Sequence, residues 1–337
     1  MQPSRPSLAV LLFPALLCLI SPAHAQENSQ EKTQAIRVSV DRVNVGVIVT
    51  DPAGQFIEGL RREDFHIFDN GVEQPLTDFA TIKEPAQVLL LIEAGPAVYL
   101  LEGGHLQAAL GMLDGLSPGD RVAVVKYAEA PQAILDFTAD QRAVVAAFGQ
   151  LRFNLGFGSL NLSSSVSSVL DWLTSVQGKK SIVLLSSGVD TSPSNELDLV
   201  IQQLKVSDVR LLAVSLTGGL QNPQPVKKKK SPVRNQTQTA AQFEEADQLL
   251  KRMAESTGGR AYFPVSARDF DSAYTEIAQL VRHEYSLAFA PSVRDGAIHS
   301  VRVHVGILHT PTPNAPPVAP YRIDYRQAYL APPPTTP

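Results

Sequence analysis

The chain has a single cysteine, Cys18, among its 337 residues, and this cysteine lies close to the N-terminus. One cysteine cannot form a disulfide within its own chain. If the N-terminal segment is removed during export, the mature protein has no thiol, so neither disulfide bonds nor thiol chemistry can contribute to its stability or function.

The chain also lacks an excess of positive charge. Its 29 Lys and Arg against 33 Asp and Glu give a formal net charge of -4, with a pI near 6.0. A nucleic-acid surface needs clustered Lys and Arg, so we expect no nucleic-acid partner. The short basic run Lys227 to Lys230 lies among Gly, Pro, Asn and Gln, and it predicts a flexible insert over residues 217–238.

No apolar run near the N-terminus is long enough to cross a membrane. The run from Leu8 to Ile20 falls short of the roughly 20 residues that a spanning helix needs. Arg5 precedes it and Ala23-His24-Ala25 follows it, which is the pattern of a signal peptide cleaved after Ala25. We therefore expect a secreted or periplasmic protein with no integral membrane segment after cleavage. A lipoprotein anchored through Cys18 is an alternative, but the bulky leucines around that cysteine fit lipid attachment poorly.

The apolar pattern predicts an α/β fold. Val88 to Ile92 is an unbroken apolar run that ends at Glu93 and a Gly-Pro break, which indicates a central parallel strand buried on both faces. From Gln87 onward, similar runs alternate with helical patterns, as in βαβ units. We therefore predict a doubly wound, mostly parallel sheet over residues 86–284, with ligands or partners at the carboxyl ends of its strands.

Period-two alternation at both ends of the chain predicts a second β structure. The N-terminal β unit, residues 36–84, alternates through Val43, Val45 and Val47, and residues 285–327 alternate again. Neither end has enough core to be stable alone. We predict that the two ends meet in one antiparallel β-sandwich beside the α/β domain, and that residues 328–337 form a disordered tail.

Four segments together resemble the von Willebrand factor type A-related family of exported bacterial proteins. The resemblance covers nearly all of the mature chain and implies the same doubly wound fold with β elements at its ends. It rests on residues 45–79, with Asp51-Pro52-Ala53-Gly54-Gln55 and Asp69-Asn70-Gly71, on Ser117 to Val122, on Val183 to Thr191, and on Ala254 to Arg260.

The resemblance also implies a metal-ion-dependent adhesion site, in which an Asp-x-Ser-x-Ser turn, a Thr and a second Asp hold Mg²⁺. The chain departs from this pattern at every position, because the matching residues are Glu93, Gly95, Ala97, Ser159 and Ser187. One carboxylate remains where the family uses two, so we expect no metal and no cofactor. Buried without metal, Glu93 would have to face solvent, bond to nearby hydroxyls or amides, or carry a raised pKa.

The sequence shows no catalytic constellation. Ser186-Ser187-Gly188 lacks the nucleophile elbow of serine hydrolases, and the seven histidines share no spacing that suggests one site. Gly156-Phe157-Gly158 is not followed by the Lys-Ser/Thr of a phosphate loop. We therefore expect a protein that is not an enzyme.

These observations predict an exported, non-catalytic module that binds or scaffolds another protein through the face at the carboxyl ends of the sheet. Two alternatives remain open: a metal-dependent adhesion module that keeps weak Mg²⁺ binding through Glu93, and a hydrolase with an unrecognised site. The residues expected on the partner-binding face are Glu93, Gly95, Ala97, Gly158, Ser159, Ser187 and Asp190.

Overall fold

A computed structural model describes residues 42–82, 85–95, 98, 104–153, 158–221, 236–306 and 321–334. These residues belong to one compact unit that extends from Val40 to Pro337. The predicted signal peptide, Ala97 and the Lys227 to Lys230 run lie outside the described residues. No helix in the described part of the chain is long and apolar enough to cross a membrane.

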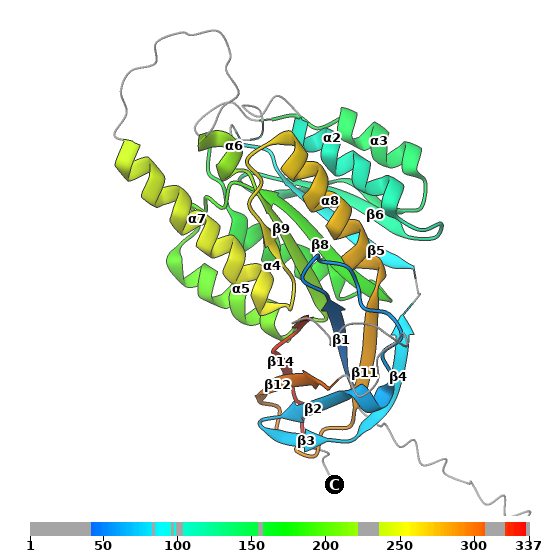
Figure 1. Ribbon diagram of the computed structural model, residues 1–337. Coiled ribbons are helices and arrows are strands. Elements are labelled where there is room, and N and C mark those ends of the chain that lie inside the picture. Colours follow the sequence, from blue (N-terminus) through cyan, green and yellow to red (C-terminus); the bar gives the residue numbers. More distant parts are fainter. Residues whose placement is uncertain are drawn as a thin grey trace, which may run out of the picture. The chain divides into compact units, whose positions relative to one another are not determined.

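A six-stranded sheet forms the centre of the α/β domain, in the order β10-β9-β8-β5-β6-β7 (Figure 1). All neighbouring strands are parallel except β6 and β7. This arrangement confirms the predicted doubly wound, mostly parallel sheet. The strands are β5 (Ala86–Glu93), β6 (Arg121–Tyr127), β7 (Pro131–Thr138), β8 (Lys179–Ser186), β9 (Val209–Ser215) and β10 (Ala261–Tyr262).

Helices on both faces of the sheet explain the unbroken apolar run in β5. Val88, Leu90 and Ile92 pack into a core with residues of α2, α3 and α8, whereas Leu89 and Leu91 pack with residues of α4, α5 and α7. Both faces of the strand are therefore shielded from solvent, and all eight of its residues are buried. The helices are α2 (Gly104–Gly111), α3 (Gln141–Gly149), α4 (Leu162–Leu173), α5 (Ser194–Val206), α6 (Thr217–Gln221), α7 (Gln236–Ser256) and α8 (Ala267–Arg282), with short 3-10 turns at Arg62–Asp64 and Met112–Gly115.

The predicted flexible insert over 217–238 was wrong at both of its ends. Residues 217–221 form α6, and α7 already begins at Gln236. Thr217 is buried, and its hydroxyl lies 2.8 Å from a carboxylate oxygen of Asp247 on α7, which holds this end of the segment in place. The Gly- and Gln-rich composition that suggested a loop does not reveal this contact.

The two ends of the chain meet in a sandwich of two four-stranded sheets, as predicted. β1 pairs with β11 and β13, and β2 pairs with β12, all antiparallel. The sheets have the orders β13-β1-β11-β4 and β14-β12-β2-β3 (Figure 1). The strands are β1 (Val43–Thr50), β2 (Phe65–Asp69), β3 (Val72–Gln74), β4 (Leu76–Ile82), β11 (Glu284–Phe289), β12 (Ile298–Val305), β13 (Arg322–Tyr325) and β14 (Ala328–Leu330).

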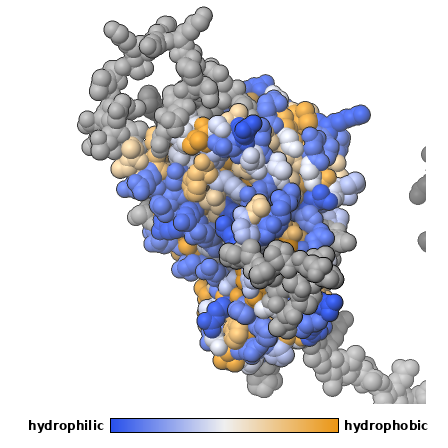
Figure 2. Space-filling view, in the orientation of Figure 1, coloured by the Kyte–Doolittle hydropathy of each residue, from blue (hydrophilic) through white to orange (hydrophobic). Residues whose placement is uncertain are grey.

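The surface is mixed in character. On the face shown in Figure 2, hydrophobic residues lie in small groups among hydrophilic ones. Exposed apolar side chains of this kind are normal for a protein surface and do not by themselves identify an interface.

The prediction of a disordered tail from residue 328 was wrong for its first residues. β14 pairs with β12, and the buried ring of Tyr329 lies edge-on to Phe289 with 5.6 Å between the ring centroids. The Tyr329 hydroxyl donates a hydrogen bond of 2.9 Å to Asp69. Both contacts reach residues distant in sequence, so the Pro-rich surroundings of Tyr329 conceal them.

Replacing Tyr329 by Ala should lower the free energy of unfolding by about 3–5 kcal/mol, because it removes a buried aromatic ring and its hydrogen bond. The neighbouring Leu330 is exposed, so Leu330→Ala is the matched control and should change stability by less than about 0.5 kcal/mol. Urea unfolding followed by circular dichroism measures both variants. Equal effects of the two substitutions would show that β14 does not belong to the folded core.

Candidate functional site

A polar cluster lies at the carboxyl ends of three adjacent strands. Glu93 is the last residue of β5, Tyr127 the last of β6 and Ser186 the last of β8, and Ser187 follows directly. In the sheet, β5 lies between β6 and β8, and Glu93 is in register with Tyr127. These four residues, which we call the carboxyl-edge cluster, occupy the edge where α/β sheets bind ligands.

Glu93 is the centre of the carboxyl-edge cluster. Its Oε2 accepts hydrogen bonds from the backbone N–H of Ser187 at 2.7 Å and from the Ser187 hydroxyl at 2.8 Å. The hydroxyls of Ser186, at 3.3 Å, and Tyr127, at 3.4 Å, lie within reach of the same oxygen. Glu93 is 0% exposed. Of the three expectations for this residue, the structure confirms bonding to hydroxyls and an amide.

A second set of hydrogen bonds fixes the hydroxyls around Glu93. Ser186 Oγ lies 2.7 Å from the Tyr127 hydroxyl and accepts the N–H of Gly188 at 2.8 Å. Burial raises the pKa of Tyr127, and the nearby carboxylate of Glu93 raises it further, so the phenol keeps its proton. The hydroxyls of the cluster are therefore neutral groups already engaged with one another.

Burial also raises the pKa of Glu93, although the hydrogen bonds from Ser187, Ser186 and Tyr127 act in the opposite direction. All of these donors act on Oε2. Among the described residues, Oε1 has no hydrogen-bond partner. A buried carboxylate with one unpartnered oxygen is costly to ionise, which agrees with the raised pKa.

Gly95 leaves space that two larger side chains use. A Cβ atom at this position would lie 2.9 Å from a methyl carbon of Leu160 and 3.2 Å from Oε1 of Glu93, and the first distance is too short. Gly95, Glu93 and Ser187 are all buried. These three predicted site residues lie together beneath the surface, where they can support a partner-binding face but cannot contact the partner.

Asp190 serves a different purpose, since it caps α4. Its two carboxylate oxygens accept the backbone N–H groups of Leu162 at 3.2 Å, Ser163 at 3.1 Å and Ser192 at 2.9 Å, and Oδ2 also accepts the Ser163 hydroxyl. Carboxylates are favoured at this end of a helix because the first N–H groups have no partner within it. Asp190 thus fixes its loop to the start of α4.

Of the other predicted residues, Gly158 and Ser159 are exposed and lie in the loop before α4. This loop is joined to the loop of Asp190, because Leu160 and Thr191 exchange hydrogen bonds of 2.8 and 3.0 Å. The structure therefore places Gly158 and Ser159 on the surface beside Asp190. The sequence prediction of the partner-binding face did not include Tyr127, or Ser186, which was weighed only as a hydrolase residue. Both end buried strands next to β5 and could have been found by that signal.

The residues of the carboxyl-edge cluster do not fit Mg²⁺. This ion takes six oxygen ligands in near-ideal octahedral geometry, usually with one or more carboxylates. Glu93 is the single carboxylate in the cluster, its Oε2 already accepts two short hydrogen bonds, and both oxygens of Asp190 are bound to N–H groups. In the described ranges, no three His, Cys, Asp or Glu side chains are grouped so that they could hold a metal ion.

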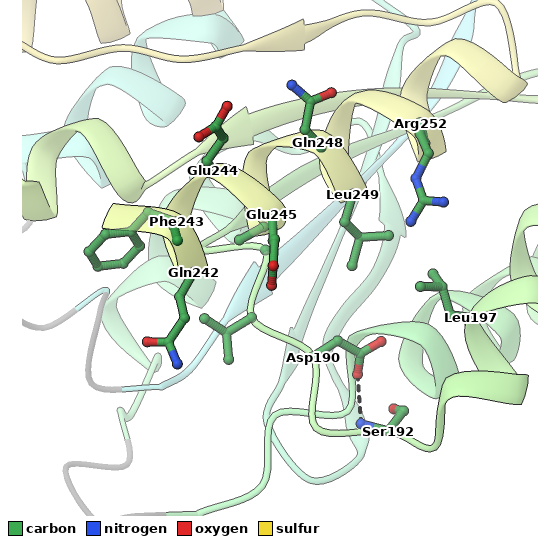
Figure 3. Close-up of a pocket in the computed structure, with 14 residues that line it drawn as sticks. Asp190, Ser192, Leu197, Gln242, Phe243, Glu244, Glu245, Gln248, Leu249 and Arg252 are labelled. Atoms are coloured by element: carbon green, nitrogen blue, oxygen red, sulfur yellow. Dashed lines mark hydrogen bonds between the residues drawn. The ribbon is translucent and has the colours of Figure 1, made fainter. Parts of the chain in front are cut away.

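A groove of about 930 Å³ lies beside the carboxyl-edge cluster, between the loop that follows β8 and the helices α5 and α7. In Figure 3, Glu245, Leu249 and Arg252 point from α7 toward the loop that carries Asp190. Val189, which is 39% exposed, also lines this groove. We call it the α5–α7 groove; its further lining residues include Gly188, Leu197, Phe243 and Ala246.

The structure thus defines an α/β domain with a buried polar cluster at the carboxyl ends of its central strands. A sequence model of the von Willebrand factor type A domain matches residues 105–280, which is more than half of the chain. The chain therefore belongs to the von Willebrand factor type A domain family. A domain of this family suggests a protein-interaction or adhesion module.

Three solved structures are similar to the chain. One is a von Willebrand factor type A protein from Catenulispora acidiphila (12% identity, TM-score 0.44, 71% of this chain and 69% of that chain covered). The second is an aerotolerance-related membrane protein from Bacteroides fragilis (14% identity, TM-score 0.42, 58% of this chain and 98% of that chain covered). The third is proximal thread matrix protein 1 from the mussel byssus (12% identity, TM-score 0.44, 63% of this chain and 51% of that chain covered). No curated protein matches the sequence.

The raised pKa of Glu93 predicts how stability depends on pH. A carboxyl group whose pKa is higher in the folded than in the unfolded state favours folding when it is protonated. Its contribution is full below the unfolded pKa of about 4.3 and is lost as the pH rises through the folded pKa. Glu93→Gln keeps the shape without titrating, so its free energy of unfolding should decline less than that of the wild type over this range.

Urea unfolding at a series of pH values measures this difference. Glu255→Gln is the control, because Glu255 is exposed on α7 and the substitution should keep the wild-type pH profile. Parallel profiles for the wild type and Glu93→Gln would show that Glu93 titrates normally in the folded protein.

Proposed function

We propose that this protein is an exported, non-catalytic binding or scaffolding module that holds another protein at the carboxyl edge of its sheet without a bridging metal ion. Its membership of the von Willebrand factor type A family supports the general class. The N-terminal pattern around Leu8 to Ile20, with cleavage after Ala25, supports export to the periplasm or beyond the cell.

The engagement of Glu93 is the observation that supports a metal-free mode of binding. An adhesion metal must be held by protein oxygens and still leave one position open for the partner. Glu93 instead directs Oε2 at the amide and hydroxyl of Ser187 and is closed off from solvent. Recognition would then depend on shape and on direct hydrogen bonds, with the carboxyl-edge cluster as a rigid support beneath the contact surface.

The α5–α7 groove is the surface best suited to contact a partner. Val189 is an exposed apolar side chain that lines it, and Glu245 and Arg252 provide charged groups of opposite sign. An apolar patch with a polar rim is typical of protein interfaces. The exposed residues Gly158 and Ser159 belong to the loop that is hydrogen-bonded to the segment leading into the groove.

A charged residue in the groove should abolish partner binding. We expect Val189→Asp to prevent the immobilised protein from capturing its partner from an envelope extract, because it places an unpaired charge in the apolar part of the contact. Leu199→Asp is the matched control, since Leu199 is an exposed apolar residue of the neighbouring helix α5 that does not line the groove. Capture should persist in the presence of EDTA. Loss of all capture with the chelator, or equal capture by both variants, would count against the proposal.

Metal binding can also be measured directly. Calorimetric titration of the purified protein with Mg²⁺ or Mn²⁺ should give no saturable heat. The cluster offers a single carboxylate, that of Glu93, and its Oε2 already accepts two hydrogen bonds from Ser187. The metal-dependent alternative predicts saturable binding that disappears in Glu93→Ala. Observing that pair of results would replace the present proposal with the adhesion-site function.

A further inference from the structure

A second cavity lies at the opposite end of the α/β sheet. It has a volume of about 490 Å³ and is lined by the first residues of β8 and β9 together with residues of the sandwich. We call it the amino-end cavity. The residues that matter to its chemistry are Lys179, Lys180, Arg210, Glu284 and Arg326. It is independent of the carboxyl-edge cluster and of the function proposed for it.

Two buried cations in this cavity share one carboxylate. Nζ of Lys179 lies 3.3 Å from Oε2 of Glu284, and Nη2 of Arg210 lies 3.2 Å from the same oxygen. The side chains of Lys179 and Arg210 are 5% and 8% exposed. The ion pairs lower the pKa of Glu284 against the effect of burial, so this carboxylate is ionised and contributes a single negative charge.

The other two carboxylates that line the cavity, those of Asp78 and Asp208, belong to exposed residues and balance the buried positive charge only weakly. Lys180 pairs with Asp208 at 2.8 Å, but the Asp208 side chain is 64% exposed, so solvent weakens its contribution. Arg326 donates one hydrogen bond, from Nη2 to the backbone oxygen of Asn44 at 2.6 Å. The buried part of the cavity therefore holds more positive than negative charge.

Several donors in the cavity have no acceptor. Nζ of Lys179, Nε of Arg210 and Nε of Arg326 are buried and have no hydrogen-bond partner among the described residues. The contact from Lys179 to Glu284 is thus an ion pair without a well-aligned hydrogen bond. Unpartnered buried donors and uncompensated charge are both costly, and an anion would satisfy them together.

The backbone around the cavity leaves no space for a second carboxylate from β1. A Cβ atom at Gly46 would lie 2.8 Å from the carboxylate atoms of Glu284, so a side chain at this position would displace Glu284. The Gly46 carbonyl also accepts a hydrogen bond of 3.2 Å from Arg210. Gly46 therefore supplies space and an acceptor to the cavity but no charge to balance Lys179 and Arg210.

We propose that the amino-end cavity binds a small oxyanion, the size of inorganic phosphate or of a ligand's carboxylate group, with Lys179, Arg210 and Arg326 as its hydrogen-bond donors. Lys and Arg are the side chains that proteins use for such groups. The exposed residues Asn44 and Asp208 also line the cavity, so it opens to solvent and a small anion can enter. Burial lowers the pKa of Lys179 in the free protein, and a bound anion would favour its charged form.

Thermal unfolding of the mature protein tests this proposal. Sodium phosphate, sodium acetate and sodium chloride are compared at equal ionic strength and fixed pH, because general screening acts alike in all three. An anion that binds the folded state raises the unfolding midpoint in a saturable manner. Saturable stabilisation by phosphate alone identifies a tetrahedral oxyanion, and saturable stabilisation by acetate identifies a carboxylate. A rise that does not saturate is the general effect of a salt excluded from the protein surface and would count against binding. Equal midpoints in all three salts would overturn the proposal.

Variants locate the binding. Lys179→Met keeps the apolar stem and removes the ammonium, and it should weaken the apparent affinity for the stabilising anion about tenfold or more. Lys251→Met removes the same charge from an exposed position of α7 and should leave the affinity unchanged. Arg326→Gln is the second variant, because Arg326 is only half-buried and forms no ion pair with Glu284, so folding of this variant does not depend on breaking that pair. Equal losses in Lys179→Met and Lys251→Met, or full affinity in Arg326→Gln, would contradict the assigned donors.

Discussion

The burial of β5 on both faces is the constraint on which the rest of the structure depends. Its apolar residues divide between two cores, and this requires helices on each side of the sheet. The strand ends in Glu93, so the same burial places a carboxylate inside the protein. That carboxylate needs donors from neighbouring strands, and Ser187 and Tyr127 provide them. The carboxyl-edge cluster is thus a direct consequence of where β5 lies.

The two ends of the sheet satisfy their buried charges differently. At the carboxyl end, a single carboxylate is surrounded by neutral hydroxyls and an amide. At the amino end, Lys179 and Arg210 share Glu284, and Nζ of Lys179 and Nε of Arg210 have no hydrogen-bond partner among the described residues. β8 contributes to both ends, since it begins at Lys179 and ends at Ser186. At the carboxyl end, neighbouring residues of the described chain satisfy Oε2 of Glu93 but not Oε1, whereas the amino end has unpartnered cationic donors that an anion would satisfy.

The sequence was sufficient to predict those parts of the fold that depend on local periodicity. The apolar run before Glu93 predicted a central strand, and alternation at both ends of the chain predicted the sandwich. Contacts between distant residues could not be predicted in this way. Tyr329 is buried through Phe289 and Asp69, and the amino-end cavity joins Lys179 to Glu284. At the site, the sequence identified Glu93 and Ser187, but the depth of their burial depends on the packing of whole layers and has no local signal.

Glu93 and Gly95, which the resemblance matches to metal-site positions of the family, are physically coupled. Glu93 is one methylene longer than the Asp that the resemblance implies at this position, and its carboxylate bonds to the amide and hydroxyl of Ser187. Gly95 has no side chain, and Leu160 and the second oxygen of Glu93 occupy the space beside it. A serine at residue 95 would crowd both. Restoring one liganding oxygen alone would therefore disturb the packing without rebuilding a metal site. On the proposed function, this coupling favours a partner surface defined by shape, because its support is held by hydrogen bonds and apolar contacts that need no cation.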